Sequence, residues 1–225
     1  MEKLEVITKF VVFDLDGTLV DSADQIYRAF NSACEELSIQ KLEKVEVASR
    51  IGLPAKELFS HLPLTQESLQ LAISTFRKHL YRQELQESDL FADVMNFLEL
   101  LTKNGLQLAV ATNKPETLAK KALSDCGIIR YFETIVGADP LPPKPNPALL
   151  STCQNFLGAL ASQTVMVGDR IEDVEAAKLA GMRSYGVAQG THTNEALLAS
   201  GATEVFSSIS EMYRLTKKGW QFEKL

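Results

Sequence analysis

A short apolar run that ends in two aspartates constrains this chain more than any other feature. Residues 10–13, Phe-Val-Val-Phe, carry no polar side chain, which is typical of a strand buried on both faces of a parallel sheet. Asp14 and Asp16 follow. Alternate side chains of an extended chain point the same way, so both carboxylates should leave the strand on one side. Neighbouring carboxylates repel unless a cation separates them or one keeps a proton, so the pair predicts a ligand site at the strand's carboxyl end.

From residue 91 onwards, the sequence alternates between expected strands and helices. Strands are predicted at 106–111, 134–136, 164–167, 183–187 and 204–206, and helices at 92–103, 115–126, 147–157, 172–180 and 194–200. Such alternation with short connections predicts right-handed crossovers and a parallel sheet covered on both faces. The expected fold class is therefore α/β, with a Rossmann-like parallel sheet as its core.

Residues 20–89 contain no strand-like run and form an expected helical insert. Ser22 and Gln25 have the spacing of a capping box at the start of a first helix, and helical periodicity continues over 45–51, 54–62 and 65–85. We therefore expect two domains. The core comprises residues 1–19 and 90–225, and an all-helical cap domain, residues 20–89, is inserted after the first strand.

Composition narrows the classes of partner. The formal net charge is −6, and Lys and Arg are not clustered as nucleic-acid backbone binding requires. No apolar run reaches membrane-spanning length, and residues 1–9 lack the apolar core of a signal peptide. We expect a cytoplasmic protein that binds neither nucleic acid nor membrane, as a monomer or a homodimer. The three cysteines are far apart in sequence and are expected as free thiols.

Polar residues also follow other predicted strands, at the sheet edge where ligands bind. A hydroxyl and an amide stand at a helix start, where free N–H groups favour an anion. A lysine lies in a proline-rich loop, and two further aspartates are one helical turn apart. These residues are Thr112, Asn113, Lys144, Asp169 and Asp173. Each alone is commonly a helix cap or a solvated side chain, but together they predict one polar centre.

Three or four carboxylates with one lysine point to phosphoryl transfer. Hard oxygen ligands suit Mg²⁺, whereas the three histidines lack the spacing of zinc ligands. In this scheme Asp14 attacks phosphorus, and Asp16 acts as general acid and then as general base. The metal, Lys144, Thr112 and Asn113 would stabilise the equatorial oxygens.

The motifs Asp14-Leu-Asp16-Gly-Thr18, Thr112-Asn113, Lys144-Pro-Asn-Pro147 and Gly168-Asp169 with Asp173 resemble the four motifs of the haloacid dehalogenase superfamily of phosphatases. Within it, the chain is similar to the phosphoglycolate phosphatase branch, whose helical cap follows the first strand. The resemblance implies Asp14 as nucleophile, Asp16 as acid/base, and Thr112 and Lys144 as phosphate partners. It also implies Mg²⁺ held by Asp14, the backbone carbonyl of Asp16 and Asp169, with Asp173 supporting.

Two positions depart from the pattern of these relatives. Arg170 stands where many carry Ser or Thr, which could alter the surroundings of the metal, and Ala92-Asp93 replaces a Pro-Gly that usually follows the cap. In the cap, Arg50 and Lys56 flank a Gly-Leu-Pro turn that corresponds to a substrate-reading segment of relatives. Arg50 would pair with a substrate carboxylate, or it is a solvated arginine at a helix end.

The expected function is Mg²⁺-dependent hydrolysis of a small phosphorylated metabolite through an aspartyl-phosphate, with 2-phosphoglycolate as the best candidate. Inorganic pyrophosphate, sugar phosphates and nucleotides remain alternatives, as do a phosphomutase and a phosphonatase on the same scaffold. A receiver-type signalling domain would lack Asp16 and the cap. A silent binding protein would be expected to have lost Asp14, Lys144 or Asp169, and all three are present.

Overall fold

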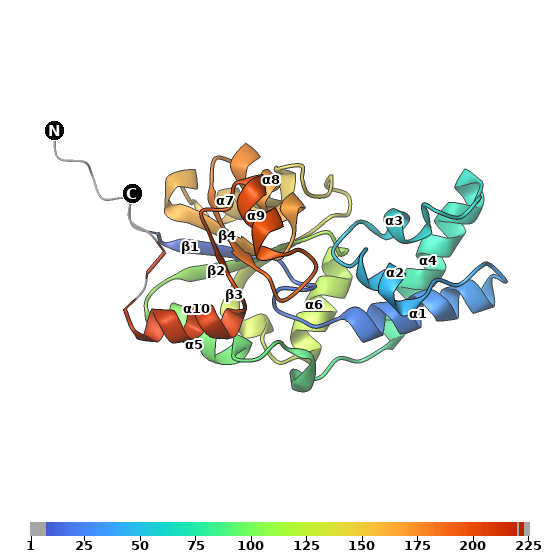
Figure 1. Cartoon of the computed structure of the whole chain (residues 1–225), viewed down its shortest axis with the longest axis horizontal. Helices are drawn as coiled ribbons and strands as arrows, with labels where there is room; N and C mark the ends of the chain where they lie inside the picture. Colours follow the sequence, from blue (N-terminus) through green and yellow to red (C-terminus); the bar gives the residue numbers. More distant parts are fainter. Residues whose placement is uncertain (1–7, 220, 223–225) are drawn as a thin grey trace.

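The computed structural model describes residues 8–219, 221 and 222 and confirms the predicted α/β fold (Figure 1). Its sheet consists, within these residues, of six parallel strands in the order β3-β2-β1-β4-β5-β6. The strands are β1 Phe10–Phe13, β2 Gln107–Thr112, β3 Phe132–Gly137, β4 Thr164–Gly168, β5 Arg183–Val187 and β6 Glu204–Phe206. The chain runs from β1 outward on one side and returns to β4 on the other. The carboxyl end of β1 therefore lies at the switch point where such sheets bind ligands.

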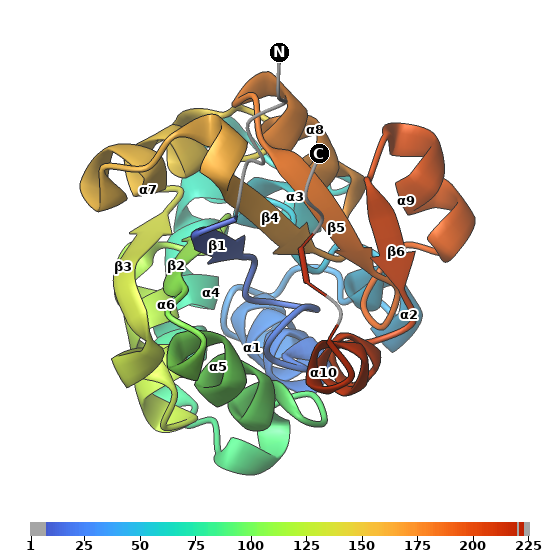
Figure 2. The same cartoon turned by 90° about the vertical axis from the view of Figure 1, so that its left-hand side faces the viewer.

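Helices cover both faces of the sheet (Figure 2). One face packs against α5 Val94–Lys103, α6 Glu116–Asp125 and α10 Ile209–Lys217, and the other against α7 Ala148–Leu157 and α8 Ile171–Leu179. A further helix, α9 Asn194–Ser200, packs on α8 beside β6. The alternation of β1 explains this: Val11 and Phe13 belong to the core shared with α5, whereas Val12 packs with α7 and α8.

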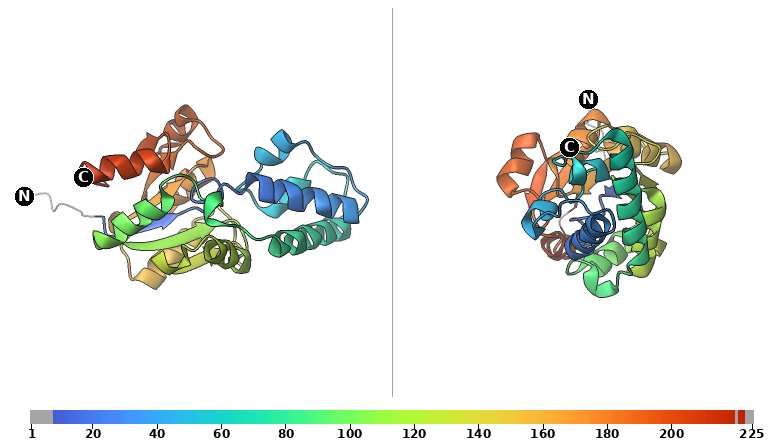
Figure 3. Two further views of the ribbon diagram at one scale, coloured as in Figure 1. Left: turned by 90° about the horizontal axis from the view of Figure 1, so that it is seen from below. Right: turned by 90° about the vertical axis from the view of Figure 1, so that its right-hand side faces the viewer.

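The helices between β1 and α5 gather at one end of the molecule, apart from the sheet (Figure 3). They are α1 Ala23–Glu36, α2 Lys44–Ala48, α3 Ala55–Phe59 and α4 Gln66–Arg82, followed by a short 3₁₀ helix, Glu87–Asp89. They enclose a hydrophobic core of their own, in which the ring of Phe59 contacts Phe30 and Phe76 at centroid distances of 5.1 and 6.2 Å. This separate core supports our proposal that residues 20–89 form a cap domain, a name kept below.

Some local predictions were wrong. Ser22 precedes α1 but makes no capping bond, because its φ of −91° and ψ of 7° differ from the extended conformation of an N-cap. Helices α2 and α3 are shorter than predicted, because the chain after each helix turns with a hydrogen bond to the third residue back, from Arg50 to Val47 and from Leu62 to Phe59. Helix α10 was not predicted. Asp93 has a left-handed φ of 63°, a conformation that glycine adopts most easily.

The structure also bears on the expectations for the cysteines and for membrane-spanning segments. Cys34, Cys126 and Cys153 are buried and free, as predicted. Burial raises the pKa of the Cys153 thiol to about 12, so this thiol stays protonated at neutral pH. In the described part of the chain, every helix is too short or too polar to cross a bilayer.

Candidate active site

Asp14 stands at the point where β1 leaves the sheet. Its N–H donates to the carbonyl of Val167 at 2.9 Å, which continues the pairing with β4, and its side chain is buried. The chain then turns at Gly17, whose φ of +87° favours glycine. A Cβ at Gly17 would lie 2.6 Å from Oδ2 of Asp169, so the turn approaches the end of β4 as closely as a backbone can. The turn therefore brings two sequence-distant aspartates together.

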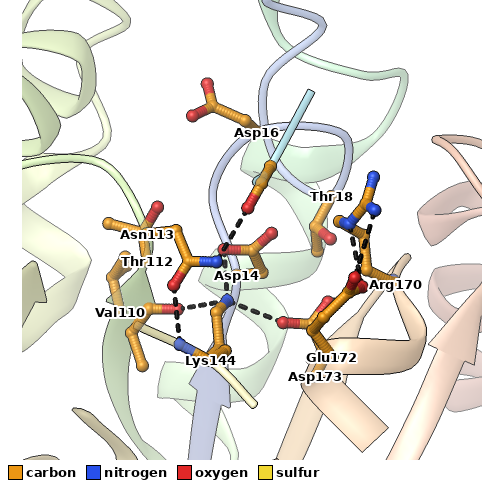
Figure 4. A network of polar contacts seen from close by, with 12 residues as sticks. Asp14, Asp16, Thr18, Val110, Thr112, Asn113, Lys144, Arg170, Glu172 and Asp173 are labelled. Carbon is orange, nitrogen blue, oxygen red and sulfur yellow. Dashed lines mark hydrogen bonds and ion pairs between the residues drawn. The ribbon is translucent and has the colours of Figure 1, made fainter. Parts of the chain in front are cut away.

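Lys144 lies at the centre of the polar network (Figure 4). Its Nζ is 2.7 Å from Oδ1 of Asp14 and 2.6 Å from Oδ1 of Asp173, and it donates to the carbonyl of Ala111 at 2.8 Å. Its backbone N–H donates to Oδ1 of Asn113 at 2.8 Å. The proline-rich loop thus holds Lys144 buried against two carboxylates rather than in solvent.

Burial shapes the titration of this cluster. Burial raises the pKa of Asp14 to about 8, and the charges of Asp173 and Asp169 add to this while Lys144 opposes it. Burial also raises the pKa of Asp169 to about 6, with Asp173 adding and hydrogen bonds from Thr191 and Thr18 opposing. For Lys144, burial favours the neutral amine, but Asp14 and Asp173 outweigh it and the pKa rises. One ammonium faces three carboxylates, which leaves room for a further positive charge.

The carboxylates of Asp14, Asp169 and Asp173 form a donor set that fits a divalent cation. One oxygen from each lies within 4.8 Å of the others, and all three side chains are buried. Thr18 Oγ1 donates to Asp169 at 3.0 Å. Position 190 requires glycine, because a Cβ there would lie 2.1 Å from Oδ2 of Asp169 and would displace this carboxylate. Buried oxygen donors of this kind suit a hard divalent cation such as Mg²⁺.

Asp16 lies apart from that cluster and is paired with a residue that the sequence analysis missed. Nζ of Lys114 is 2.6 Å from Oδ1 of Asp16, and the two side chains are only 5% and 6% exposed. Figure 4 shows the carboxylate of Asp16 turned away from Asp173. The signal for Lys114 was its place directly after Thr112 and Asn113, at the sheet edge where ligands bind.

Thr112 and Asn113 both lie at this edge, but their side chains are already engaged. Thr112 Oγ1 accepts a hydrogen bond from the N–H of Lys114 at 3.2 Å. The amide of Asn113 accepts from Lys144 and donates to the carbonyl of Gly52 at 2.9 Å. Asn113 therefore joins the lysine loop of the core to the cap.

Arg170 makes a second connection to the cap. Its Nη1 donates to the carbonyl of Ile51 at 2.7 Å, and its Nε and Nη2 contact Glu172 at 3.0 and 3.3 Å. A Cβ at Gly52 would lie 2.6 Å from Cδ of Arg170, so the turn rests directly on this side chain. The backbone N–H of Arg170 also donates to Oδ2 of Asp173, and its positive charge opposes the rise in the pKa of Asp169. Arg170 therefore bears both on the cap and on the carboxylates that could hold a metal.

A cavity lies between cap and core above Asp16. It holds about 460 Å³ of space between the atoms, counting the part that is open to solvent, and most of its lining is apolar. Arg50 lines it and donates to the carbonyl of Glu46 at 2.6 Å. Lys56 is exposed, pairs with Glu57 at 3.7 Å and lines a separate outer cavity. The structure therefore brings Arg50, but not Lys56, to the space above Asp16.

Comparisons with known proteins show which family and which fold the chain resembles. Residues 11–187 match the family described as haloacid dehalogenase-like hydrolase. The chain is 36% identical to "Probable phosphatase IndB" of Dickeya dadantii, covering 90% of each sequence, and 33% identical to "Phosphoglycolate phosphatase" of Chromobacterium violaceum, covering 94% and 97%. The crystal structure of "a predicted phosphatase" from Clostridium acetobutylicum superimposes with a TM-score of 0.84 at 26% identity, covering 94% and 99%.

Proposed function

The chain belongs to the haloacid dehalogenase-like hydrolases and is a phosphatase, and from this premise we propose that it hydrolyses small phosphomonoesters with Mg²⁺ through a phosphate carried on Asp14. The observation that carries the proposal is the meeting of Asp14 with Lys144 and two further buried carboxylates at the end of β1. Aspartyl-phosphate chemistry needs a carboxylate nucleophile beside fixed positive charge, and these residues supply both.

In the first half of the reaction, a carboxylate oxygen of Asp14 attacks phosphorus as the bond to the ester oxygen breaks. Asp16 donates a proton to the departing alkoxide. Lys144, held beside Asp14 by the Ala111 carbonyl, offsets the charge of the equatorial oxygens. In the second half, Asp16 takes a proton from water, which attacks phosphorus and releases inorganic phosphate from Asp14.

Asp14 and Asp169, supported by Asp173, would hold Mg²⁺, together with the backbone carbonyl of Asp16 that the resemblance implies. The bound cation would supply charge stabilisation to the transferring phosphoryl group. Thr18 and the N–H of Thr191 hold both oxygens of Asp169 in place, at 3.0 and 2.8 Å, so this carboxylate is preorganised for a ligand.

We propose 2-phosphoglycolate as the best candidate substrate. Relatives that cover nearly the whole chain are named phosphoglycolate phosphatase, and the cavity above Asp16 is lined by Arg50, a partner for a carboxylate. Pyrophosphate, sugar phosphates and nucleotides remain the alternatives, with a phosphomutase less favoured. Lys56, the residue that a phosphonatase would need for a Schiff base, lies outside that cavity. A cytoplasmic location, and a monomer or homodimer, stay predictions.

The test is phosphate release from a panel of phosphomonoesters and pyrophosphate, with Mg²⁺ and with chelator. We expect metal-dependent turnover that falls by about 10⁴-fold or more in Asp14→Asn, since loss of a nucleophile costs this order in kcat. Lys120→Met, at an exposed position on α6, is the matched control and should retain full activity. Turnover that survives in Asp14→Asn, or that needs no metal, would refute the mechanism.

A further inference from the structure

Lys114 is a buried cation beside the reacting centre to which the mechanism gives no task. It lies on the core side of the cavity, 2.6 Å from Asp16, and it is only 7% exposed. A buried ammonium is costly to keep unless it is paired. A lysine at this place therefore needs a partner in every state of the site, including the state in which substrate lies against Asp16.

The cavity around Lys114 is otherwise apolar, with two more cations on its cap side. Its charged lining residues are Lys114, Arg50, Arg77 and a single acid, Asp16. The apolar lining comes mainly from Ile26, Leu53, Leu58, Phe76, Leu80 and Leu118. Nη1 of Arg77 pairs with Asp139 across the two domains, but its Nε is buried without a hydrogen-bond partner among the described residues. Three cations against one acid favour a ligand that brings negative charge of its own.

We propose that Lys114 is a specificity residue that binds a carboxylate on the alcohol part of the substrate. This inference rests on the proposed phosphatase reaction. Asp16 must approach the ester oxygen within about 2.6–3.2 Å to protonate it. Because Lys114 touches the same carboxyl group, the substrate carboxylate lies close to the ester oxygen, with one or two carbons between them. The site is therefore built for a short phosphorylated hydroxy acid.

The experiment compares two esters of equal size that differ in charge. For wild type, Lys114→Met and the control Lys120→Met, kcat and KM are measured with 2-phosphoglycolate and with 2-hydroxyethyl phosphate, whose end group is a neutral hydroxyl. We expect wild type and Lys120→Met to prefer 2-phosphoglycolate. Lys114→Met should reduce this preference about ten- to a hundredfold, because a charge-assisted hydrogen bond to the carboxylate is lost.

The preference separates this role from a structural one. If Lys114→Met slows both esters equally, the lysine acts only by holding Asp16, and the proposal is wrong. It is also wrong if wild type hydrolyses the neutral ester as well as 2-phosphoglycolate. If wild type hydrolyses neither ester, the proposed reaction fails for this substrate class. The role of Lys114 is then tested by calorimetry, which measures the binding of both esters to Asp14→Asn with and without Lys114→Met. Tighter binding of 2-phosphoglycolate than of the neutral ester, lost with Lys114, would support the site, and equal binding would overturn it.

Discussion

Replacing Arg170 by the much shorter serine should weaken closure of the cap. Arg170 is 5% exposed, and its guanidinium donates to the carbonyl of Ile51 at 2.7 Å. A hydrogen bond from a charged donor contributes about 1.5–3 kcal/mol. Since this contact joins cap to core, its loss should shift the closing equilibrium by the same amount, which is roughly 10- to 150-fold.

The expected kinetic result is a rise in KM of about tenfold or more with a smaller change in kcat. Substrate binding must then supply the free energy of closure, because the binding-competent closed state is less populated. Hydrogen exchange over residues 50–54 should accelerate in the substrate-free protein. The assay is steady-state kinetics with the best substrate, together with exchange measured by mass spectrometry.

One further variant serves as a control for this contact, and a second removes the neighbouring contact between core and cap. Glu172→Gln weakens the ion pair beside Arg170 without touching the bond to Ile51, so its KM should stay close to that of wild type. Asn113→Ala removes the neighbouring bond to Gly52 together with the bond that holds the backbone of Lys144, so it should raise KM as Arg170→Ser does and also lower kcat. A wild-type KM and unchanged exchange at residues 50–54 in Arg170→Ser would show that the contact does not hold the cap closed.

Other consequences can be tested separately. Mg²⁺ binding should tighten between about pH 6 and pH 8 and should release protons. The raised pKa values of Asp14, about 8, and Asp169, about 6, leave protons on these carboxyl groups that the metal must displace. Calorimetry in two buffers with different ionisation enthalpies measures the proton release, and binding without it would contradict the prediction. Without metal, the protonated Asp14 contributes to folding stability because its pKa in the folded protein lies above the ordinary 3.8. This contribution is fully present below about pH 4 and is lost as the pH rises towards 8, so the melting temperature in chelator should fall over this range and Mg²⁺ should restore it. A melting temperature that does not change with pH would contradict the burial argument. Gly190→Ala should lose Mg²⁺ binding because its Cβ would meet Asp169, whereas Gly158→Ala, in open space at a φ of +61°, should cost only about 1 kcal/mol and leave binding intact. Phe59→Ala, 1% exposed in the cap core, should cost about 3–5 kcal/mol in urea unfolding, and a loss below 1 kcal/mol would mean that the cap core contributes little.

The sheet and the gathering of its polar residues were predictable because both follow from periodicity and topology. Once β1 lies between β2 and β4, the residues that follow each strand meet at one edge. Helix α10 was missed although it carried a local signal: Ser208 accepts from the N–H of Glu211, and the Glu211 carboxylate accepts from Ser207. The capping box predicted at Ser22 was wrong because residue spacing does not fix the backbone angles on which capping depends.

Contacts between cap and core were beyond the reach of the sequence. Arg170 and Ile51 are 119 positions apart, and their bond depends on how two separately packed domains meet. Lys114 could not be distinguished from an ordinary surface lysine until its burial against Asp16 was known. Sequence patterns therefore located the residues that end strands, while the structure was needed to show which of them pair with one another.

The amide of Asn113 links two events that are usually considered separately. Its oxygen holds the backbone of Lys144 and its nitrogen holds the Gly52 carbonyl of the cap turn. Opening the cap breaks the bond from Asn113 to Gly52. The Asn113 side chain is then less restrained, and so is the Lys144 backbone that it holds. By thermodynamic reciprocity, an anion that orders the Lys144 loop must favour the closed cap by the same free energy with which closure strengthens anion binding. Inorganic phosphate, the product, should therefore hold the cap shut, and its release should become easier as the cap opens.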